Sequence, residues 1–194
     1  MITAILLASG YSRRLHTDKL LLDLDGRPVI DYIMAAIESC PFAQKLLVQR
    51  SERYTELGLQ HGFRSLTNPS AALGQSSSVR IGAENCRTDS AFMFFVGDQP
   101  YLTTDIIARL LHVHAEYPDD IIVPTNRQRY QNPVIFPVAF RRQLLTIEGD
   151  QGGRTIIKSH PERVRTVPFD DELAFQDIDT TEDYQFLLKA FKNR

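Results

Sequence analysis

Short apolar runs alternate with amphipathic segments along the 194 residues of the chain. The apolar runs have the length of strands and are bounded by turn residues, which predicts buried strands. The amphipathic segments repeat apolar residues at helical spacing, which predicts helices packed on a sheet. The predicted strands are Ile2–Leu7, Leu46–Gln49, Phe63–Leu66, Ala91–Val96, Ile121–Val123 and Val134–Phe136. The predicted helices are Pro28–Ser39, Ser76–Cys86, Thr103–Tyr117 and Thr181–Phe191.

Buried strands that alternate with helices predict an α/β fold, a three-layer sandwich around a Rossmann-like, mostly parallel sheet. The length suits one domain, residues 1–194. In such sheets a ligand binds beyond the carboxyl ends of the strands. The residues directly after Leu7 and Val96 are therefore the first candidates for chemistry.

The net charge of −2 provides no basic field for nucleic acid or an anionic membrane, so neither is expected as a partner. Cys40 and Cys86 lie in no metal-binding or redox motif, and we expect both to be reduced. The apolar start of the chain is too short for a signal peptide or a membrane span. These features predict a cytoplasmic protein.

The loop after the first predicted strand combines small and cationic residues. Gly10 lets the backbone approach a ligand closely, and Arg13, Arg14 and Lys19 place three cations within seven residues. This composition suits a triphosphate. The loop matches neither the dinucleotide fingerprint nor the P-loop. The alternative is a surface loop with solvated cations.

Carboxylates follow the strand Ala91–Val96 and recur near the carboxyl end of the chain. Asp98 is placed to bind Mg²⁺, which takes one or two carboxylates together with phosphate oxygens; the alternative is a turn aspartate that bonds its own backbone. If residues 175–179 are extended, Asp177 and Asp179 face the same side. We assign Asp177 to the metal and Asp179 mainly to capping the helix that follows. The alternative for this pair is capping and solvent contact alone.

Three segments together resemble the molybdenum-cofactor nucleotidyltransferases, both cytidylyl- and guanylyl-transferring, of the nucleotide-diphospho-sugar transferase fold. LLASGYSRRLHTDKLLL resembles the family signature L-A-[AG]-G-x-S-x-R-M-G-x-x-K, GDQP resembles its metal-binding turn, and DIDTTED resembles D-I-D-T-P-E-D, with Thr181 in place of Pro. The resemblance implies that Arg14 and Lys19 hold the triphosphate. It also implies that the base and ribose face Leu7, Ala8, Ser9 and Gly10. Ser9 and His16 depart from the family pattern, which has Ala or Gly and then Gly.

Further segments resemble the family's nucleotide and acceptor sides. The stretch from Asn68 to Val79 resembles N-P-x-x-x-x-G-x-x-x-S-[VL], which implies nucleotide contacts from Asn68, Gly74 and Ser78. Its hydroxyls could equally cap a helix. The segments around Asn132 and Gly149 resemble acceptor-side motifs, with Asn132 where His is more usual. The residues implied for acceptor binding are Asn132, Pro133, Asp150 and Arg154.

The resemblance implies a Mg²⁺-dependent enzyme that transfers CMP from CTP to the phosphate of molybdopterin and releases pyrophosphate. Arg14, Lys19 and Asp98 would be catalytic, and a target molybdoenzyme is a possible partner. GTP is the second nucleotide, and a sugar phosphate is another acceptor. A cofactor carrier without transferase activity is the alternative of another class, and a nicotinamide dehydrogenase is disfavoured by the missing fingerprint.

Overall fold

The computed structural model describes residues 1–12, 14–15, 17–150 and 152–192. Arg13 and His16 of the first loop lie outside the described residues. The strands are β1 Ile2–Ala8, β2 Asp23–Leu24, β3 Arg27–Pro28, β4 Gln44–Gln49, β5 Arg64–Thr67, β6 Ala91–Val96, β7 Ile121–Asn126, β8 Arg129–Tyr130, β9 Val134–Phe136 and β10 Val164–Pro168. The helices are α1 Val29–Glu38, α2 Thr55–Gln60, α3 Gln75–Asn85, α4 Thr104–Glu116, α5 Arg141–Thr146, α6 Arg154–Ser159 and α7 Thr181–Lys192.

The described residues build one eight-stranded mixed sheet in the order β10-β7-β9-β6-β1-β4-β5, with β8 paired to β7. β1 lies in its interior and runs parallel to both of its neighbours, β4 and β6. β9 is antiparallel to β6 and β7. Leu7 of β1 lies opposite Val96 of β6. The carboxyl ends of these two strands therefore meet at the same edge, as the sequence predicts for the ligand site.

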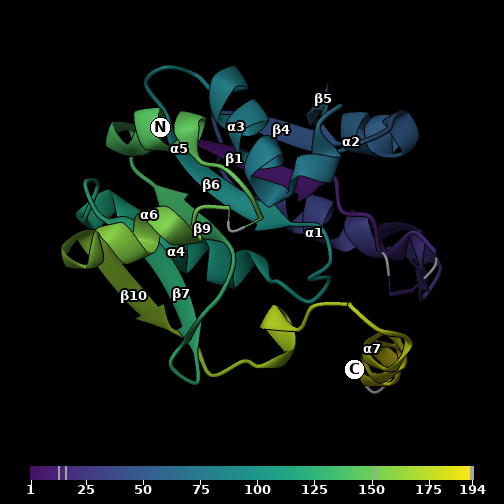
Figure 1. Cartoon of the computed structure of the whole chain (residues 1–194). Helices are drawn as coiled ribbons and strands as arrows, with labels where there is room; N and C mark the ends of the chain where they lie inside the picture. Colours follow the sequence, from purple (N-terminus) through teal and green to yellow (C-terminus); the bar gives the residue numbers. More distant parts are fainter. Residues whose placement is uncertain (13, 16, 151, 193–194) are drawn as a thin grey trace.

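Apolar side chains on both faces of the sheet pack against helices, which form a layer on each side (Figure 1). On β6, Met93 and Phe95 pack in the cluster that contains residues of α1 and α4. Phe92 and Phe94 pack in the opposite cluster, with residues of α3, α5 and α6. Successive side chains of a strand point to opposite faces, so strands covered on both faces are apolar throughout.

The helix α7 lies apart from the sheet, at the lower right of Figure 1. Ile178 and Leu187 are fully buried in a third cluster with Leu24, Val29 and Tyr101. The backbone N–H of Ile178 donates to the carbonyl of Asp98 at 3.2 Å. Burial of Ile178 thus brings the acidic segment before α7 against the end of β6, about 80 residues earlier in the chain.

The predicted three-layer α/β fold is confirmed, and each predicted helix and strand overlaps one that the structure contains. Residues 177–179, however, belong to no strand; they follow a 3-10 helix, Leu173–Phe175. Cys40 and Cys86 are free and buried, as expected. In the described part of the chain, no helix has the length and apolar character needed to cross a bilayer.

Candidate functional site

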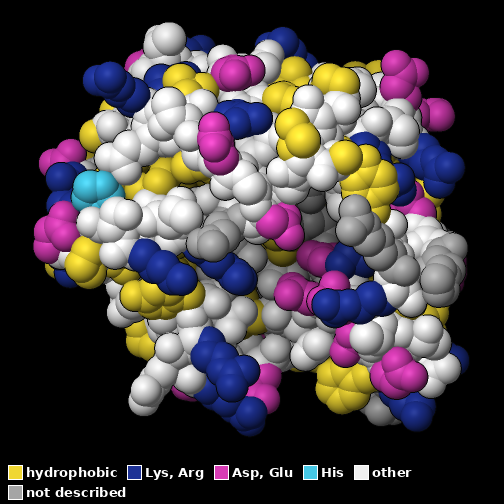
Figure 2. Space-filling model, viewed as in Figure 1, with side chains coloured by type: hydrophobic (Ala, Val, Ile, Leu, Met, Phe, Trp, Pro, Cys, Tyr) yellow, Lys and Arg dark blue, Asp and Glu magenta, His cyan; other side chains and the backbone are white. Residues whose placement is uncertain are grey.

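A cleft of about 840 Å³ opens where the chain leaves β1 and β6. Its walls come from the loop after β1, the segment before α3, the turn after β6 and the region around Gly149. Figure 2 shows acidic and basic side chains gathered around a hollow in the visible face. The predicted site residues that line this cleft are Leu7, Ser9, Gly10, Arg14, Lys19, Gly74, Ser78, Asp98 and Asp150.

The loop after β1 is shaped by Gly10 and Ser12. Among the described residues beyond its chain neighbours, none has an atom within 4 Å of the position that a Cβ on Gly10 would take, so the cleft is open there. Ser12 adopts a φ of 49°. Its carbonyl accepts from the N–H of Leu15 at 3.1 Å, and its hydroxyl accepts from the N–H of Lys19 at 3.2 Å. These bonds bend the loop and deliver Lys19 to the cleft.

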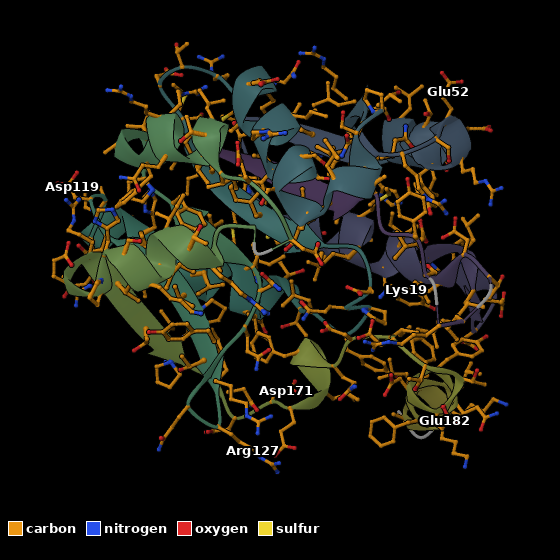
Figure 3. All side chains as sticks on the ribbon, viewed as in Figure 1. Lys19, Glu52, Asp119, Arg127, Asp171 and Glu182 are labelled. Atoms are coloured by element: carbon orange, nitrogen blue, oxygen red, sulfur yellow. The ribbon has the colours of Figure 1, made fainter. Side chains whose placement is uncertain are left out.

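Lys19, labelled in Figure 3, contacts two carboxylates that come from distant parts of the chain. Its Nζ is 2.5 Å from Oδ2 of Asp98 and 2.9 Å from Oδ1 of Asp179. Burial lowers the pKa of Lys19, but the charges and hydrogen bonds of Asp98 and Asp179 outweigh it, so that pKa stands above its ordinary value. Arg14, largely exposed, lies 3.4 Å from Oδ2 of Asp179. The structure therefore brings Arg14, Lys19 and Asp98 together.

Asp177 lies beside Asp98 but outside the walls of the cleft. Part of its side chain is exposed, and its carboxylate accepts a hydrogen bond from Nε2 of Gln99 at 2.7 Å. Desolvation of this carboxylate, together with the charge of Asp98, raises the pKa of Asp177 to about 7, although Gln99 and Lys19 act in the opposite direction. Two carboxylates that repel each other in this way create a demand for a cation.

This donor set suits a hard divalent cation such as Mg²⁺. Within the described ranges, no group of three or more His, Cys, Asp or Glu side chains could hold a metal unaided. Mg²⁺ does not need such a cage, because it binds one or two carboxylates and takes its other ligands from phosphates and water. Asp98 and Asp177 supply that number, next to a cleft that also presents Arg14 and Lys19.

The capping role expected for Asp179 is wrong. Oγ1 of Thr180 accepts from the N–H of Asp183 at 3.2 Å, and the Asp183 carboxylate accepts from the N–H of Thr180 at 2.8 Å. This reciprocal pair is a capping box shifted by one residue from the expected position. The carboxylate of Asp179 is thereby available to Lys19 and Arg14, and it joins the site.

Gly74, just before α3, and Ser78, in the first turns of that helix, line the cleft, but Asn68 does not. Asn68 is 1% exposed, and its side-chain N–H groups donate to the hydroxyls of Ser77 and Ser78, both at 2.9 Å. Its amide oxygen accepts from the N–H of Ser70 at 2.9 Å. Asn68 therefore shapes the loop rather than lining the cleft.

Ala8 is likewise buried beneath the cleft, at 1% exposure. It ends β1 opposite Gln49 of β4. Ser9 lines the cleft, but its hydroxyl donates to the carbonyl of Val48 at 3.2 Å. At Ser9, the departure from the family pattern thus ties the loop to β4.

The four predicted acceptor residues are divided between two places. Asn132 and Arg154 line a smaller pocket of about 80 Å³ that shares wall residues with the cleft. Pro133 is buried and lies outside the lining of both. Asp150 lines the main cleft, but its carboxylate accepts from the N–H of Gln75 at 3.1 Å and so caps α3. Asp150 therefore has a structural task that the sequence did not indicate.

Sequence reasoning missed several residues of the site. Gln99 holds Asp177, and Gln75 forms part of the wall shared by the two pockets. Tyr11 lines the cleft with 44% of its surface exposed. Gln99 could have been found, since it directly follows Asp98 in the GDQP turn. Nothing in the local sequence distinguishes Gln75 from an ordinary residue in the first turn of a helix.

Comparison with known proteins identifies related sequences. The family model described as "MobA-like NTP transferase domain" matches residues 4–164. A Shewanella halifaxensis protein named molybdenum cofactor guanylyltransferase is 27% identical, and the match covers 99% of this chain and 96% of that one. The Bacillus subtilis purine catabolism protein PucB is 25% identical, with 97% of each chain covered.

Solved structures share the fold. A nucleotidyl transferase from Methanothermobacter thermautotroptrophicus superposes with a TM-score of 0.84 at 20% identity, covering 100% of this chain and 98% of that one. A Mycobacterium tuberculosis protein crystallised as a complex with manganese gives a TM-score of 0.77 at 20% identity, covering 97% and 98%. Both likenesses concern the fold alone.

Proposed function

Since this chain belongs to the MobA-like NTP transferase family, we propose that it moves a nucleoside monophosphate from an NTP to the phosphate of molybdopterin. The observation that carries the proposal is the meeting of Lys19, Asp98 and Arg14 at the carboxyl ends of β1 and β6. Cations beside an open glycine loop suit a triphosphate, and a neighbouring pair of carboxylates suits the metal that accompanies one.

The reaction is a displacement at the α-phosphorus. An oxygen of the acceptor phosphate forms the new bond to this phosphorus, and the bond to the β-phosphate oxygen breaks. The electron pair of the broken bond leaves with pyrophosphate. Because the acceptor phosphate is already ionised at neutral pH, no proton has to be removed from it. The protein then contributes alignment and charge stabilisation. Lys19 and Arg14 offset the charge that develops on the departing pyrophosphate.

The metal and the acceptor follow from the same geometry. Asp98 and Asp177 would hold Mg²⁺, which would neutralise phosphate charge when bound. Asn132 and Arg154 border the smaller pocket next to the cleft, where the guanidinium of Arg154 would meet the acceptor phosphate. A cation placed there would hold the acceptor phosphate beside the triphosphate, so that its oxygen can approach the α-phosphorus.

Two nucleotides are candidates. The resemblance of the sequence to the family as a whole favours CTP. The guanylyltransferase name of the Shewanella relative favours GTP. The hydroxyl of Ser9 is committed to Val48 and does not decide between them. The test below distinguishes the two bases, and the transfer chemistry is the same for both.

The test measures pyrophosphate release with Mg²⁺ and molybdopterin, with CTP, GTP, ATP and UTP supplied separately. We expect release with CTP or GTP, dependent on both the acceptor and the metal. Release from an NTP without molybdopterin dependence would keep the chemistry and replace the acceptor. Tight molybdopterin binding without release from any NTP would overturn the proposal in favour of a carrier protein.

A further inference from the structure

The end of β4 and the segment that follows it pack against the loop after β1. In the described part of the chain, contacts join the two at three places along the loop. Ser9 Oγ donates to the carbonyl of Val48, the guanidinium of Arg50 lies 5.0 Å from the ring centre of Tyr11, and Asp18 bonds Tyr54. Tyr54 ends a short 3-10 turn that begins at Glu52, labelled together with Lys19 in Figure 3.

Asp18 is the most firmly held of the loop residues in these contacts. Its side chain is only 7% exposed, and each of its oxygens lies 2.7 Å from the hydroxyl of Tyr54. Arg50 and Arg53 each have a guanidinium nitrogen 3.7 Å from Oδ2. The carboxylate also accepts from the N–H of Leu20 at 3.4 Å, which caps the 3-10 turn that begins with Lys19.

Tyr54 is itself rigidly placed. It is 1% exposed, and its N–H donates to Oε1 of Gln49 at 3.1 Å. Gln49 is equally buried, and its Nε2 donates to Thr55 Oγ1 at 2.6 Å. Burial and the charge of Asp18 raise the pKa of Tyr54, so the hydroxyl keeps its proton and remains a donor. The anchor thus extends from the central sheet to the residue next to Lys19.

We propose that Asp18 and Tyr54 are positioning residues that fix the backbone of Lys19, so that its ammonium reaches the cleft in one orientation. This inference rests on the proposed function. A lysine side chain has large rotamer freedom, and its charge is useful only where it is held. Displacement of a catalytic group by about 1 Å can cost a hundredfold in rate. Neither Asp18 nor Tyr54 lines the cleft, so both act through Lys19.

The hydroxyl is removed in Tyr54→Phe, which keeps the buried ring. Asp18→Ala removes the acceptor, and Asp18→Asn retains an oxygen for both Tyr54 and the N–H of Leu20. Tyr32→Phe is the matched control, because it also loses a hydroxyl donor, the one bonded to the carbonyl of Leu24. The first readout is hydrogen exchange of residues 17–22 without substrate, and the second is kcat and KM for pyrophosphate release.

We expect Tyr54→Phe and Asp18→Ala to speed exchange in residues 17–22 and to lower kcat about tenfold, with KM for the acceptor unchanged. The double variant should be no slower than Asp18→Ala alone, because that change already breaks the contact with Tyr54. Asp18→Asn should restore kcat to within about threefold of the original, on the scale of one retained neutral hydrogen bond. Tyr32→Phe should match the original protein in both readouts.

Unchanged exchange in Tyr54→Phe would overturn the inference, and so would faster exchange with unchanged kcat. Equal losses of kcat in Tyr54→Phe and Tyr32→Phe would reduce the contact to a general contribution to stability and would also overturn it. If the original protein releases no pyrophosphate from any NTP, the proposed function fails. The exchange comparison alone then decides whether Asp18 and Tyr54 position Lys19.

Discussion

The ammonium of Lys19 lies 2.5 Å from a carboxylate oxygen of Asp98, and this contact joins the first loop to the end of β6. Both side chains are largely buried, at 14% and 16% exposure. A second carboxylate, that of Asp179, lies 2.9 Å from the same ammonium. Lys19 therefore occupies a place where a cation is demanded, and it competes there with any metal ion that the same carboxylates attract.

Replacement of Lys19 should separate its two effects. Lys19→Met keeps much of the side-chain volume and removes the charge. We expect pyrophosphate release to fall at least about a hundredfold, as for other lost transition-state electrostatics. Mn²⁺ should bind more tightly in the absence of nucleotide, because the competing ammonium is gone. Lys45→Met is the control, since Lys45 lies over Phe63, and it should change neither quantity. Weaker Mn²⁺ binding in Lys19→Met would contradict the competition.

Asp98 has two proposed roles in catalysis, so its replacement should have a large effect on turnover. Asp98→Ala should lower turnover at least about a hundredfold, because it removes a proposed metal ligand and the partner of Lys19. The measurement is kcat at saturating Mg²⁺ and NTP, accompanied by urea unfolding to confirm that the variant is folded. Asp89→Ala, at an exposed pair with Arg87, is the control and should keep full activity. Turnover close to normal in Asp98→Ala would reject the metal assignment.

The sequence predicts the sheet and the loop of the site well, because these depend on local patterns. The run Ala91–Val96 is apolar on both faces, and only a central strand tolerates that. Asp98 follows directly, so its place at the carboxyl end is determined by chain continuity. Lys19 follows from the composition of the loop, although its pairing with Asp98 does not.

The rest depends on contacts between segments far apart in the chain. Asp179 and Thr180 are both residue types that cap helices. Ile178 is buried and its N–H bonds the carbonyl of Asp98. The next residue, Asp179, therefore reaches Lys19, and Thr180 caps α7. Asp150 resembles an acceptor ligand in sequence, yet packing of its loop against α3 commits it to the N–H of Gln75. Asn68 bonds the hydroxyls of Ser77 and Ser78 instead of lining the cleft. No local sequence pattern indicates that these two serines would bind it.

Ser9 tests whether the departure from the family pattern sets the base. Its hydroxyl donates to the carbonyl of Val48, so Ser9→Ala should cost about 1 kcal/mol of unfolding free energy through the lost hydrogen bond. The ratio of kcat/KM between CTP and GTP should stay within about twofold. A shift of that ratio by tenfold or more would show that the hydroxyl reads the base.

Two glycines of the cleft should respond differently to alanine. Gly74 has a φ of 96°, and a Cβ there would lie 2.7 Å from the carbonyl oxygen of Gly149. Gly74→Ala should therefore lower the unfolding free energy by about 1–3 kcal/mol, measured by urea denaturation. A Cβ on Gly10 meets no atom of the other described residues within 4 Å, its chain neighbours aside, so Gly10→Ala should leave stability within about 0.5 kcal/mol.

The same pair locates the nucleotide. If the space over Gly10 receives the NTP, Gly10→Ala should raise KM for the nucleotide at least about tenfold while the protein stays as stable as before. Unchanged KM in Gly10→Ala would place the triphosphate elsewhere in the cleft. An equal loss of stability in Gly10→Ala and Gly74→Ala would contradict the different space that a Cβ meets at these two positions.

Asp177 should make metal binding depend on pH near neutrality. Its pKa is raised to about 7, so the metal-free protein holds a proton on this carboxylate below pH 7 and releases it above. A metal ion needs the ionised form and must displace that proton. The apparent association constant for Mn²⁺ should therefore fall about tenfold for each pH unit below 7 and level off above it. Titration calorimetry between pH 5.5 and 8.5 measures both the affinity and the proton released.

The matched variant is Asp177→Asn, which keeps the size of the side chain and an oxygen for Gln99. It should bind Mn²⁺ more weakly at pH 8, and its affinity should change little between pH 6 and 8, because the carboxylate that carries the proton is gone. An equally steep pH dependence in Asp177→Asn would assign the proton to another group. A flat profile in the original protein would mean that Asp177 does not contact the metal, and Asp98 would then hold it with Asp179.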